Sequence, residues 1–248
     1  MAAGSRRRAL LRSEYEQDQL ALVRGRNGIV IVAILMTVFG VVFTIVRHNK
    51  SAATDAAITL RLQRNRRPFF NRLMHLVSWP GFPPQSRLLP PSIAAALFAF
   101  GFRLEGMFQL LAWGSGGISF FFKRIMRRQR PTAGTSDIRV AVARIGGTSF
   151  PSGHVLNYLG VYGFLAYLAH TWIRPTWIRR TVVGLLGSLL ALVGPSRIYL
   201  GHHWLTDVSA SYLLGFSWLI TVTSLYRRVK NIQVARRVRL GGKRPPLW

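Results

Sequence analysis

Residues 28–46, GIVIVAILMTVFGVVFTIV, contain no charged side chain. At about 1.5 Å of rise per residue, a helix of this length covers roughly the 30 Å hydrocarbon core of a bilayer. The stretch therefore predicts a membrane-spanning helix. Arginines precede it, as in a signal peptide, but the apolar run begins late and no small-residue cleavage pattern follows it. We expect this segment to be retained.

Five more apolar runs follow, each bounded by charged or proline-containing stretches. They are residues 88–102, 106–122, 155–173, 181–196 and 208–226. A buried core helix of a soluble protein would not recur in this way, so we predict an all-α fold, a polytopic six-transmembrane-helix bundle. Only Arg103, Leu104 and Glu105 separate the first two of these runs, which indicates a helical hairpin with a tight charged turn.

The segment between the first and second predicted spans, residues 54–78, mixes arginines with large apolar side chains. Basic amphipathic helices of this kind lie among lipid headgroups, with guanidinium groups on phosphate. We expect an interfacial amphipathic helical segment, broken at Pro68, and then a proline-rich loop over residues 79–91. A nucleic-acid-binding arm is the weaker alternative, because such arms cluster their charges in a polar tract. We therefore expect no nucleic acid partner.

The charge balance is strongly basic. Lysine and arginine number 34 and aspartate and glutamate only 7, for a formal net charge of +27. Such an excess indicates a negative partner, here a bilayer with anionic headgroups or a phosphorylated substrate. The seven acids are scattered, so they do not readily form a carboxylate cage, and we expect no metal and no cofactor. Without cysteine there is no disulfide framework, thiolate zinc site or cysteine nucleophile.

Three polar stretches fall at one membrane face of the predicted topology, residues 123–131, 151–154 and 196–207. Lys123, Arg130 and Arg197 are fixed cations that suit a tetrahedral anion, because each arginine fork can bind two oxygens. Ser152 and Gly153 open a helix, where a hydroxyl, backbone N–H groups and the helix dipole favour an anion. Together these residues indicate a phosphate site.

Two histidines accompany these cations. His203 and Asp207 are four residues apart at a helix start, so the carboxylate can hold one ring nitrogen while the other faces substrate. Cysteine is absent and no aspartyl-phosphate motif is visible, so histidine is the remaining phosphoryl acceptor. His154, beside a helix N-terminus, can protonate the leaving oxygen. His202 stays ambiguous because it adjoins His203.

The other basic and glycine-rich positions have simpler interpretations. We expect interfacial anchors at Arg124, Arg127, Arg128, Arg139 and Arg144. We expect close helix contacts at Gly114, Gly116, Gly117, Gly184 and Gly187.

The three polar stretches resemble the three signature motifs of the type 2 phosphatidic acid phosphatase and vanadium haloperoxidase superfamily. The matching residues are Lys123-x6-Arg130-Pro131, Pro151-Ser152-Gly153-His154 and Ser196-Arg197-x5-His203-x3-Asp207. Every signature position is filled, in family order, whereas the first 87 residues offer no motif to compare. The resemblance implies a six-helix membrane fold and metal-independent hydrolysis of a lipid phosphate monoester or diphosphate.

Carried over residue by residue, the resemblance implies distinct roles. Phosphate binding is expected at Lys123, Arg130, Ser152, Gly153 and Arg197. His203 would be the nucleophile that forms a phosphohistidine, Asp207 its support and His154 the acid. The motifs contact only the phosphoryl group, so phosphatidate, phosphatidylglycerophosphate and undecaprenyl diphosphate all remain candidate lipid phosphate substrates.

Two alternatives come from other functional classes. A vanadate-dependent haloperoxidase-like enzyme would use a similar pocket, but the short chain and the six predicted spans argue against it. A non-catalytic phospholipid-binding or transport protein would need cations but not a poised pair of histidines, so the complete motifs argue against it as well.

The predicted spans divide the chain into three parts. We expect a basic cytoplasmic N-terminal segment (residues 1–27), a six-span membrane phosphatase domain (residues 28–226, with the motifs in 123–207) and a basic cytoplasmic tail (residues 227–248). Six spans place both termini on one side, and their basic residues indicate the cytoplasm. This predicts an integral protein of a bacterial inner (cell) membrane with an extracytoplasmic active site. Nothing in the sequence indicates an oligomeric state.

Overall fold

The structure is a computed structural model that describes residues 2–131, 138–140 and 146–239 of the chain. All regular secondary structure in these ranges is helical, which confirms the predicted all-α class. Arg144, which we expected to be an interfacial anchor, and Asp137 lie outside the described residues.

Most helices follow the apolar runs, but the run 106–122, predicted as one span, is divided between two helices that meet at Gly114. In chain order they are α1 (Ala2–Arg47), α2 (Ala52–Gln63), α3 (Pro68–Ser78), the 3-10 turn η1 (Trp79–Gly81), α4 (Gln85–Ala99), α5 (Arg103–Trp113), α6 (Ser115–Met126), α7 (Gly153–Trp172), α8 (Thr176–Tyr199) and α9 (Leu205–Arg239).

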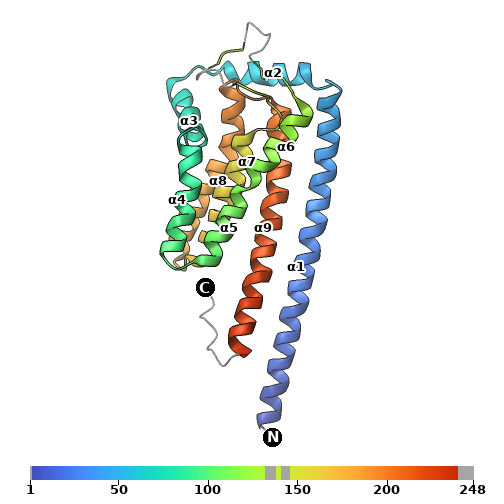
Figure 1. Ribbon diagram of the computed structural model, residues 1–248, viewed down its shortest axis with the longest axis vertical. Coiled ribbons are helices and arrows are strands. Elements are labelled where there is room, and N and C mark those ends of the chain that lie inside the picture. Colours follow the sequence, from blue (N-terminus) through green and yellow to red (C-terminus); the bar gives the residue numbers. More distant parts are fainter. Residues whose placement is uncertain (1, 132–137, 141–145, 240–248) are drawn as a thin grey trace.

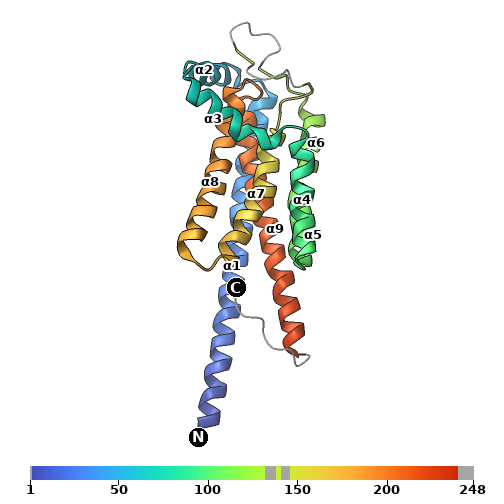
Figure 2. The same ribbon diagram turned by 90° about the vertical axis from the view of Figure 1, so that its left-hand side faces the viewer.

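The long helices run along the long axis of the molecule, and α2 lies across one end of them (Figures 1 and 2). Helix α7 is central, because it packs against α5, α6, α8 and α9. Its side chains Val155, Leu156, Leu159 and Phe164 are completely buried. The apolar run that predicted a fourth membrane span therefore forms the core of the bundle.

In the part of the chain that the structure describes, three helical segments are long and apolar enough to cross a membrane: Gly25–Arg47 of α1, Thr176–Tyr199 of α8 and Leu205–Arg236 of α9. They correspond to the first, fifth and sixth predicted spans. Ile29, Ile34 and Val41 of α1 are more than half exposed, as expected for side chains that face lipid. The start of α1 and the end of α9 lie at the end of the molecule opposite α2 (Figure 1).

The predicted hairpin is present, but its boundaries differ from the expected ones. Helices α4 and α5 pack against each other, and the chain turns at residues 100–102, where Gly101 has a φ of +82° that favours glycine. Arg103 opens α5 instead of forming the turn. Pro90 and Pro91 lie inside α4 rather than in a loop, so the predicted loop over residues 79–91 is wrong beyond Gln85. Each proline removes one backbone donor from the helix.

The segment between α1 and α4 breaks at Pro68, the first residue of α3, as predicted. Its buried side is unexpected. Asp55, Thr59 and Gln63, spaced four residues apart on α2, are buried, whereas Leu60 is exposed. Helix α2 therefore turns polar side chains toward the bundle, together with the partly buried Leu62, which packs against the core.

Close helix packing occurs at a glycine that we did not single out. A Cβ atom on Gly160 of α7 would overlap the carbonyl oxygen of Ala112 in α5. The expected close contacts at Gly116, Gly117, Gly184 and Gly187 are wrong, because a Cβ there would meet nothing within 4 Å. These four glycines lie on exposed helix faces. At Gly114 a Cβ would lie 3.7 Å from the Trp218 ring.

Replacing Gly160 by alanine should destabilise the bundle by about 1–3 kcal/mol, the usual cost of overpacking, because α5 and α7 would be forced apart. Gly184→Ala is the matched control and should be neutral or slightly stabilising, since alanine is the better helix former. Thermal unfolding of the detergent-solubilised variants, followed by circular dichroism, measures both. Equal midpoints for the two variants would contradict the packing described here.

Candidate active site

The residues of the three motifs converge at the end of the bundle that α2 covers (Figure 1). Lys123 lies in the last turn of α6, and Arg130 follows in the next loop. Ser152, Gly153 and His154 form the start of α7. Arg197 lies in the last turn of α8, His203 in the connection to α9, and Asp207 in the first turn of α9. Helix ends from four parts of the chain thus meet at one place.

Two loop segments hold the first and second motifs together. The backbone N–H of Ser149 donates to the carbonyl of Arg128 at 2.8 Å, and the Ser149 hydroxyl donates to the carbonyl of Gln129 at 3.0 Å. Lys123 Nζ donates to the carbonyl of Thr148 at 2.6 Å, and Arg130 Nη2 donates to the same carbonyl at 3.3 Å. Backbone carbonyls therefore position both cations and leave them without a carboxylate partner among the described residues.

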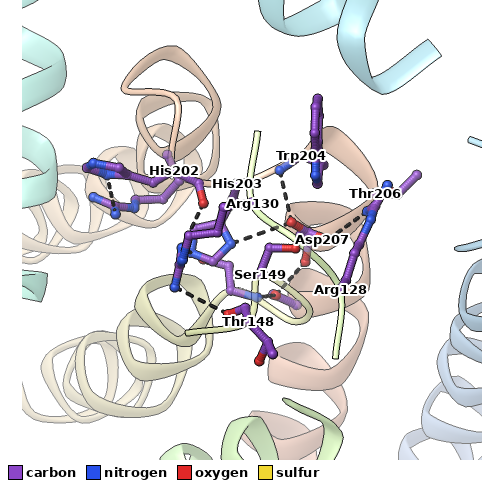
Figure 3. Close-up of polar contacts among 12 residues, drawn as sticks. Arg128, Arg130, Thr148, Ser149, His202, His203, Trp204, Thr206 and Asp207 are labelled. Atoms are coloured by element: carbon purple, nitrogen blue, oxygen red, sulfur yellow. Dashed lines mark hydrogen bonds and ion pairs between the residues drawn. The ribbon is translucent and has the colours of Figure 1, made fainter. Parts of the chain in front are cut away.

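His203 lies between a cation and a carboxylate (Figure 3). Its Nε2 atom is 3.3 Å from Arg130 Nη1, which also donates to the carbonyl of His202 at 2.7 Å. Its Nδ1 atom is 3.6 Å from Asp207 Oδ2, slightly longer than a hydrogen bond. Burial, followed by the charges of Arg130 and Arg197, lowers the pKa of His203 well below its usual range. This shift favours the neutral imidazole, the form that a nucleophile needs.

Arg197 is completely buried, and His202 is one of the residues that contact its guanidinium group. Arg197 Nη1 donates to Ser78 Oγ at 3.1 Å, and Nη2 lies 2.6 Å from His202 Nδ1. Its guanidinium carbon lies 4.8 Å from the centre of the Phe82 ring. Arg197 is thus held by a hydroxyl, an imidazole and an aromatic face, and no carboxylate of the described residues pairs with it.

Several buried polar atoms of the site have no hydrogen-bond partner among the described residues. They are Ser152 Oγ, His154 Nε2 and Arg197 Nε. Buried polar atoms are normally paired, so unpaired ones that cluster beside cations mark a place for a ligand. An anion with several acceptor oxygens would satisfy the hydroxyl of Ser152 and the Nε–H of Arg197.

The connection from α3 to α4 forms one wall of this site, which the sequence did not reveal. The ring of His154 lies against Gly81, where a Cβ atom would overlap it. The Phe82 ring packs edge-on against His154, with 4.9 Å between the ring centres. Ser78, which holds Arg197, also lies 2.8 Å from Ser196 Oγ. Ser78, Gly81 and Phe82 lie before the first motif, in a region with no signature to compare.

Arg128 corrects our interpretation of the basic residues around the first motif. It is not an interfacial anchor, because its Nη1 donates to Asp207 Oδ1 at 2.7 Å and its Nη2 to Asp55 Oδ2 at 2.6 Å. Arg139 is not a free anchor either, because its Nη2 donates to the carbonyl of Gln63 at 2.9 Å. Arg124 and Arg127 are exposed, in agreement with that interpretation.

The sequence did contain one sign that α2 faces the site with polar side chains, namely the spacing of Asp55, Thr59 and Gln63 by four residues.

Among the described residues, no group of three or more His, Asp or Glu side chains is placed to hold a metal ion. Asp55 and Asp207 are both committed to Arg128, and Glu105 lies elsewhere in the bundle, paired with Lys230. The site is therefore an assembly of cations and imidazoles.

Comparison with known proteins agrees with this geometry. The family model of the PAP2 superfamily matches residues 105–231. Phosphatidylglycerophosphatase B of Bacillus subtilis is 27% identical over 203 residues, 80% of this chain and 96% of the relative. The crystal structure of a PAP2-type phosphatidylglycerolphosphate phosphatase from Bacillus subtilis superposes with a TM-score of 0.70 and 26% identity, covering 80% of this chain and 96% of that one.

A second solved structure shares the fold. The crystal structure of Aquifex aeolicus LpxE superposes with a TM-score of 0.55 and 20% identity, covering 68% of this chain and 94% of that one. The enzyme class predicted from the motifs agrees with the names of the first two relatives. Since the family model spans more than half of the chain and all three motifs, the chain belongs to the PAP2 superfamily.

Proposed function

We propose that the protein is an integral-membrane, metal-independent lipid phosphatase that hydrolyses a lipid phosphate through a phosphohistidine on His203. One observation carries this proposal. His203 Nε2 lies 3.3 Å from Arg130 Nη1, while the carboxylate of Asp207 lies on the opposite side of the ring. A phosphoryl group bound to Arg130 would therefore meet the ring nitrogen that faces away from Asp207.

In this proposal, Lys123, Arg130 and Arg197 bind the phosphate oxygens. These three cations have no carboxylate partner among the residues that the structure describes, and an anion with two or three charges would compensate the cost of burying them. The Ser152 hydroxyl and the N-terminus of α7 at Gly153 add donors on the same side. These groups bind the transition state most tightly, because the negative charge on its equatorial phosphate oxygens must be stabilised.

The chemical steps follow from the two histidines. His203 Nε2 attacks phosphorus, and the bond to the lipid oxygen breaks as His154 gives that oxygen a proton. Asp207 compensates the positive charge that His203 gains. Water then attacks the phosphohistidine, with His154 as the base that accepts its proton, and phosphate leaves. The buried Nε2 atom of His154 has no partner among the described residues, which supports a role toward substrate.

The relatives favour one substrate among the three candidates. Both Bacillus subtilis relatives are named for phosphatidylglycerophosphate or phosphatidylglycerolphosphate. We therefore place phosphatidylglycerophosphate first, before phosphatidate and undecaprenyl diphosphate. The haloperoxidase and the non-catalytic alternatives receive no comparable support.

Purified protein should release phosphate from at least one of these three lipids, and fastest from phosphatidylglycerophosphate. Hydrolysis should persist in EDTA, because the site is built from cations and imidazoles, and orthovanadate should inhibit by mimicking the pentacoordinate state. A malachite green assay over the lipid panel, with and without EDTA, measures this. Activity that is lost in EDTA and restored by Mg²⁺ would contradict the proposed mechanism.

Replacing Lys123, Arg130 or Arg197 by alanine should in each case remove about 2–5 kcal/mol of transition-state stabilisation, measured as a fall in kcat/KM. Each replacement removes a desolvated charge that the phosphate needs. The exposed Arg127 is the matched control, and Arg127→Ala should cost far less. Steady-state kinetics on the panel's best substrate measures these differences. Similar losses in all four variants would mean that diffuse basic charge matters rather than a pocket.

We also propose six membrane crossings, by α1, α4, α5 with α6, α7, α8 and α9, within residues 28–226. The segment 1–27 and the tail 227–248 would lie in the cytoplasm, and the site would face the outside of a bacterial inner membrane. The site and the start of α1 lie at opposite ends of the molecule (Figure 1), which supports this orientation. So do the basic residues at the far end of α9.

Because the chain contains no cysteine, single cysteines report sidedness directly. Arg64→Cys, at the exposed end of α2 near the site, should react with an impermeant thiol reagent in intact cells. Thr176→Cys, at the exposed start of α8, should react only after the membrane is permeabilised. The reverse pattern would place the site in the cytoplasm.

A further inference from the structure

We propose that Arg128 and Asp55 are positioning residues for the nucleophile. Arg128 holds one oxygen of Asp207 so that the other stays directed at His203, and Asp55 holds Arg128 in place. The inference rests on the proposed function, since it assigns Asp207 its role beside His203. Neither Arg128 nor Asp55 belongs to the three motifs.

The contacts of Asp207 leave its carboxylate one orientation (Figure 3). Oδ1 accepts from Arg128 Nη1 at 2.7 Å, and Oδ2 accepts from the backbone N–H of Trp204 at 2.9 Å. Oδ2 is also the oxygen that lies 3.6 Å from His203 Nδ1. A carboxylate on a single bond could otherwise rotate, so the two fixed contacts keep Oδ2 on the histidine side.

Asp55 fixes the other end of Arg128. It is completely buried, and its Oδ2 accepts from Arg128 Nη2 at 2.6 Å. The same carboxylate accepts from Thr206 twice, from the backbone N–H at 3.0 Å and from the hydroxyl at 2.7 Å. Thr206 directly precedes Asp207. Asp55 therefore fixes both the guanidinium and the start of the helix that carries Asp207, in the manner of a helix cap supplied by α2.

Arg128 is itself confined. Only 13% of its side chain is exposed, and its guanidinium carbon lies 5.7 Å from the centre of the Trp204 ring. Nη1 also lies 2.7 Å from the Thr206 hydroxyl, and Nη2 lies 3.3 Å from the Ser51 hydroxyl. Few surface ion pairs have this many fixed partners, so the geometry points to a specified contact rather than an adventitious one.

The charges give this arrangement a testable signature. Asp55 and Asp207 share one cation in Arg128, so the unit carries a net charge of −1. His203 faces Asp207 from the connection before α9. The positive charges of Lys123 and Arg130 interact with the carboxylate of Asp207 from the phosphate side. Without Arg128, two buried carboxylates would face each other, and one would take up a proton more readily. A protonated Asp207 could no longer compensate a phosphorylated His203.

The test compares kcat and KM across pH, with a short-chain phosphatidylglycerophosphate or phosphatidate in detergent. Arg128→Met should lower kcat by about 10- to 100-fold, as loss of a partner that orients a ligand or catalytic group does, with KM within about two-fold of wild type. Its acid limb of kcat should move to higher pH. Arg127→Met, the adjacent exposed control, should match wild type.

The double variant separates positioning from structure. Adding Asp55→Asn to Arg128→Met removes the second carboxylate, so part of kcat should return and the acid limb should move back. A purely structural role predicts at least as large a loss in the double variant and an unshifted pH profile, and that result would overturn the inference.

A conservative variant covers the case in which Arg128→Met does not fold. Arg128→Lys keeps the charge and loses the fork, so it should lower kcat less than Arg128→Met is expected to, with the wild-type acid limb. If Arg128→Lys and Asp55→Asn both retain the wild-type kcat, this inference is overturned while the proposed function still stands. A folded wild type that hydrolyses none of the lipid phosphates would instead overturn the proposed function, and this inference with it.

Discussion

Burial of positive charge at one end of an apolar bundle is the constraint on which the site depends. Lys123, Arg130 and the completely buried Arg197 have no carboxylate within ion-pair distance among the described residues. Burying such cations without compensation is costly. The protein meets part of this cost with backbone carbonyls, at Thr148 and His202, and with the ring of Phe82. The remaining deficit is what a phosphate ion is suited to remove.

The scarcity of carboxylates follows from the same constraint. An acid placed beside the phosphate cations would pair with them and repel the substrate. The acids near the site are instead kept to its rear, where Arg128 occupies Asp207 and Asp55. Asp207 therefore presents only one oxygen toward His203, on the ring nitrogen that faces away from Arg130. The placement of Asp55 and Asp207 thus has a physical meaning at the site.

Much of this site could be predicted from the sequence, because its chemistry is carried by residue types at fixed spacing. The three motifs predicted Lys123, Arg130, Ser152, Gly153, His154, Arg197, His203 and Asp207, and the structure brings all of them to one end. The expected helical spacing of His203 and Asp207 was only approximate, because His203 lies in the connection just before α9 and Asp207 in the first turn of that helix. The helices were predictable for a similar reason, because uninterrupted apolar runs leave few alternatives to a helix in a bilayer.

The rest depended on contacts between segments far apart in the chain. Arg128 differs from Arg127 only in where the loop after α6 directs it, and no local pattern distinguishes a buried arginine from an exposed one. The wall formed by Gly81 and Phe82 likewise exists only because α3 packs against α8 and η1 against α7. The turn at Gly101 was misplaced because charged residues are common both in turns and in the first turn of a helix.

The central claim is that His203 receives the phosphoryl group, and rapid acid-free quenching of the enzyme with ³²P-labelled lipid phosphate tests it most directly. The account predicts an acid-labile, base-stable phosphoenzyme in wild type and in His154→Ala, and none in His203→Ala. Formation of the same phosphoenzyme by His203→Ala would contradict the account and place the nucleophile on another residue.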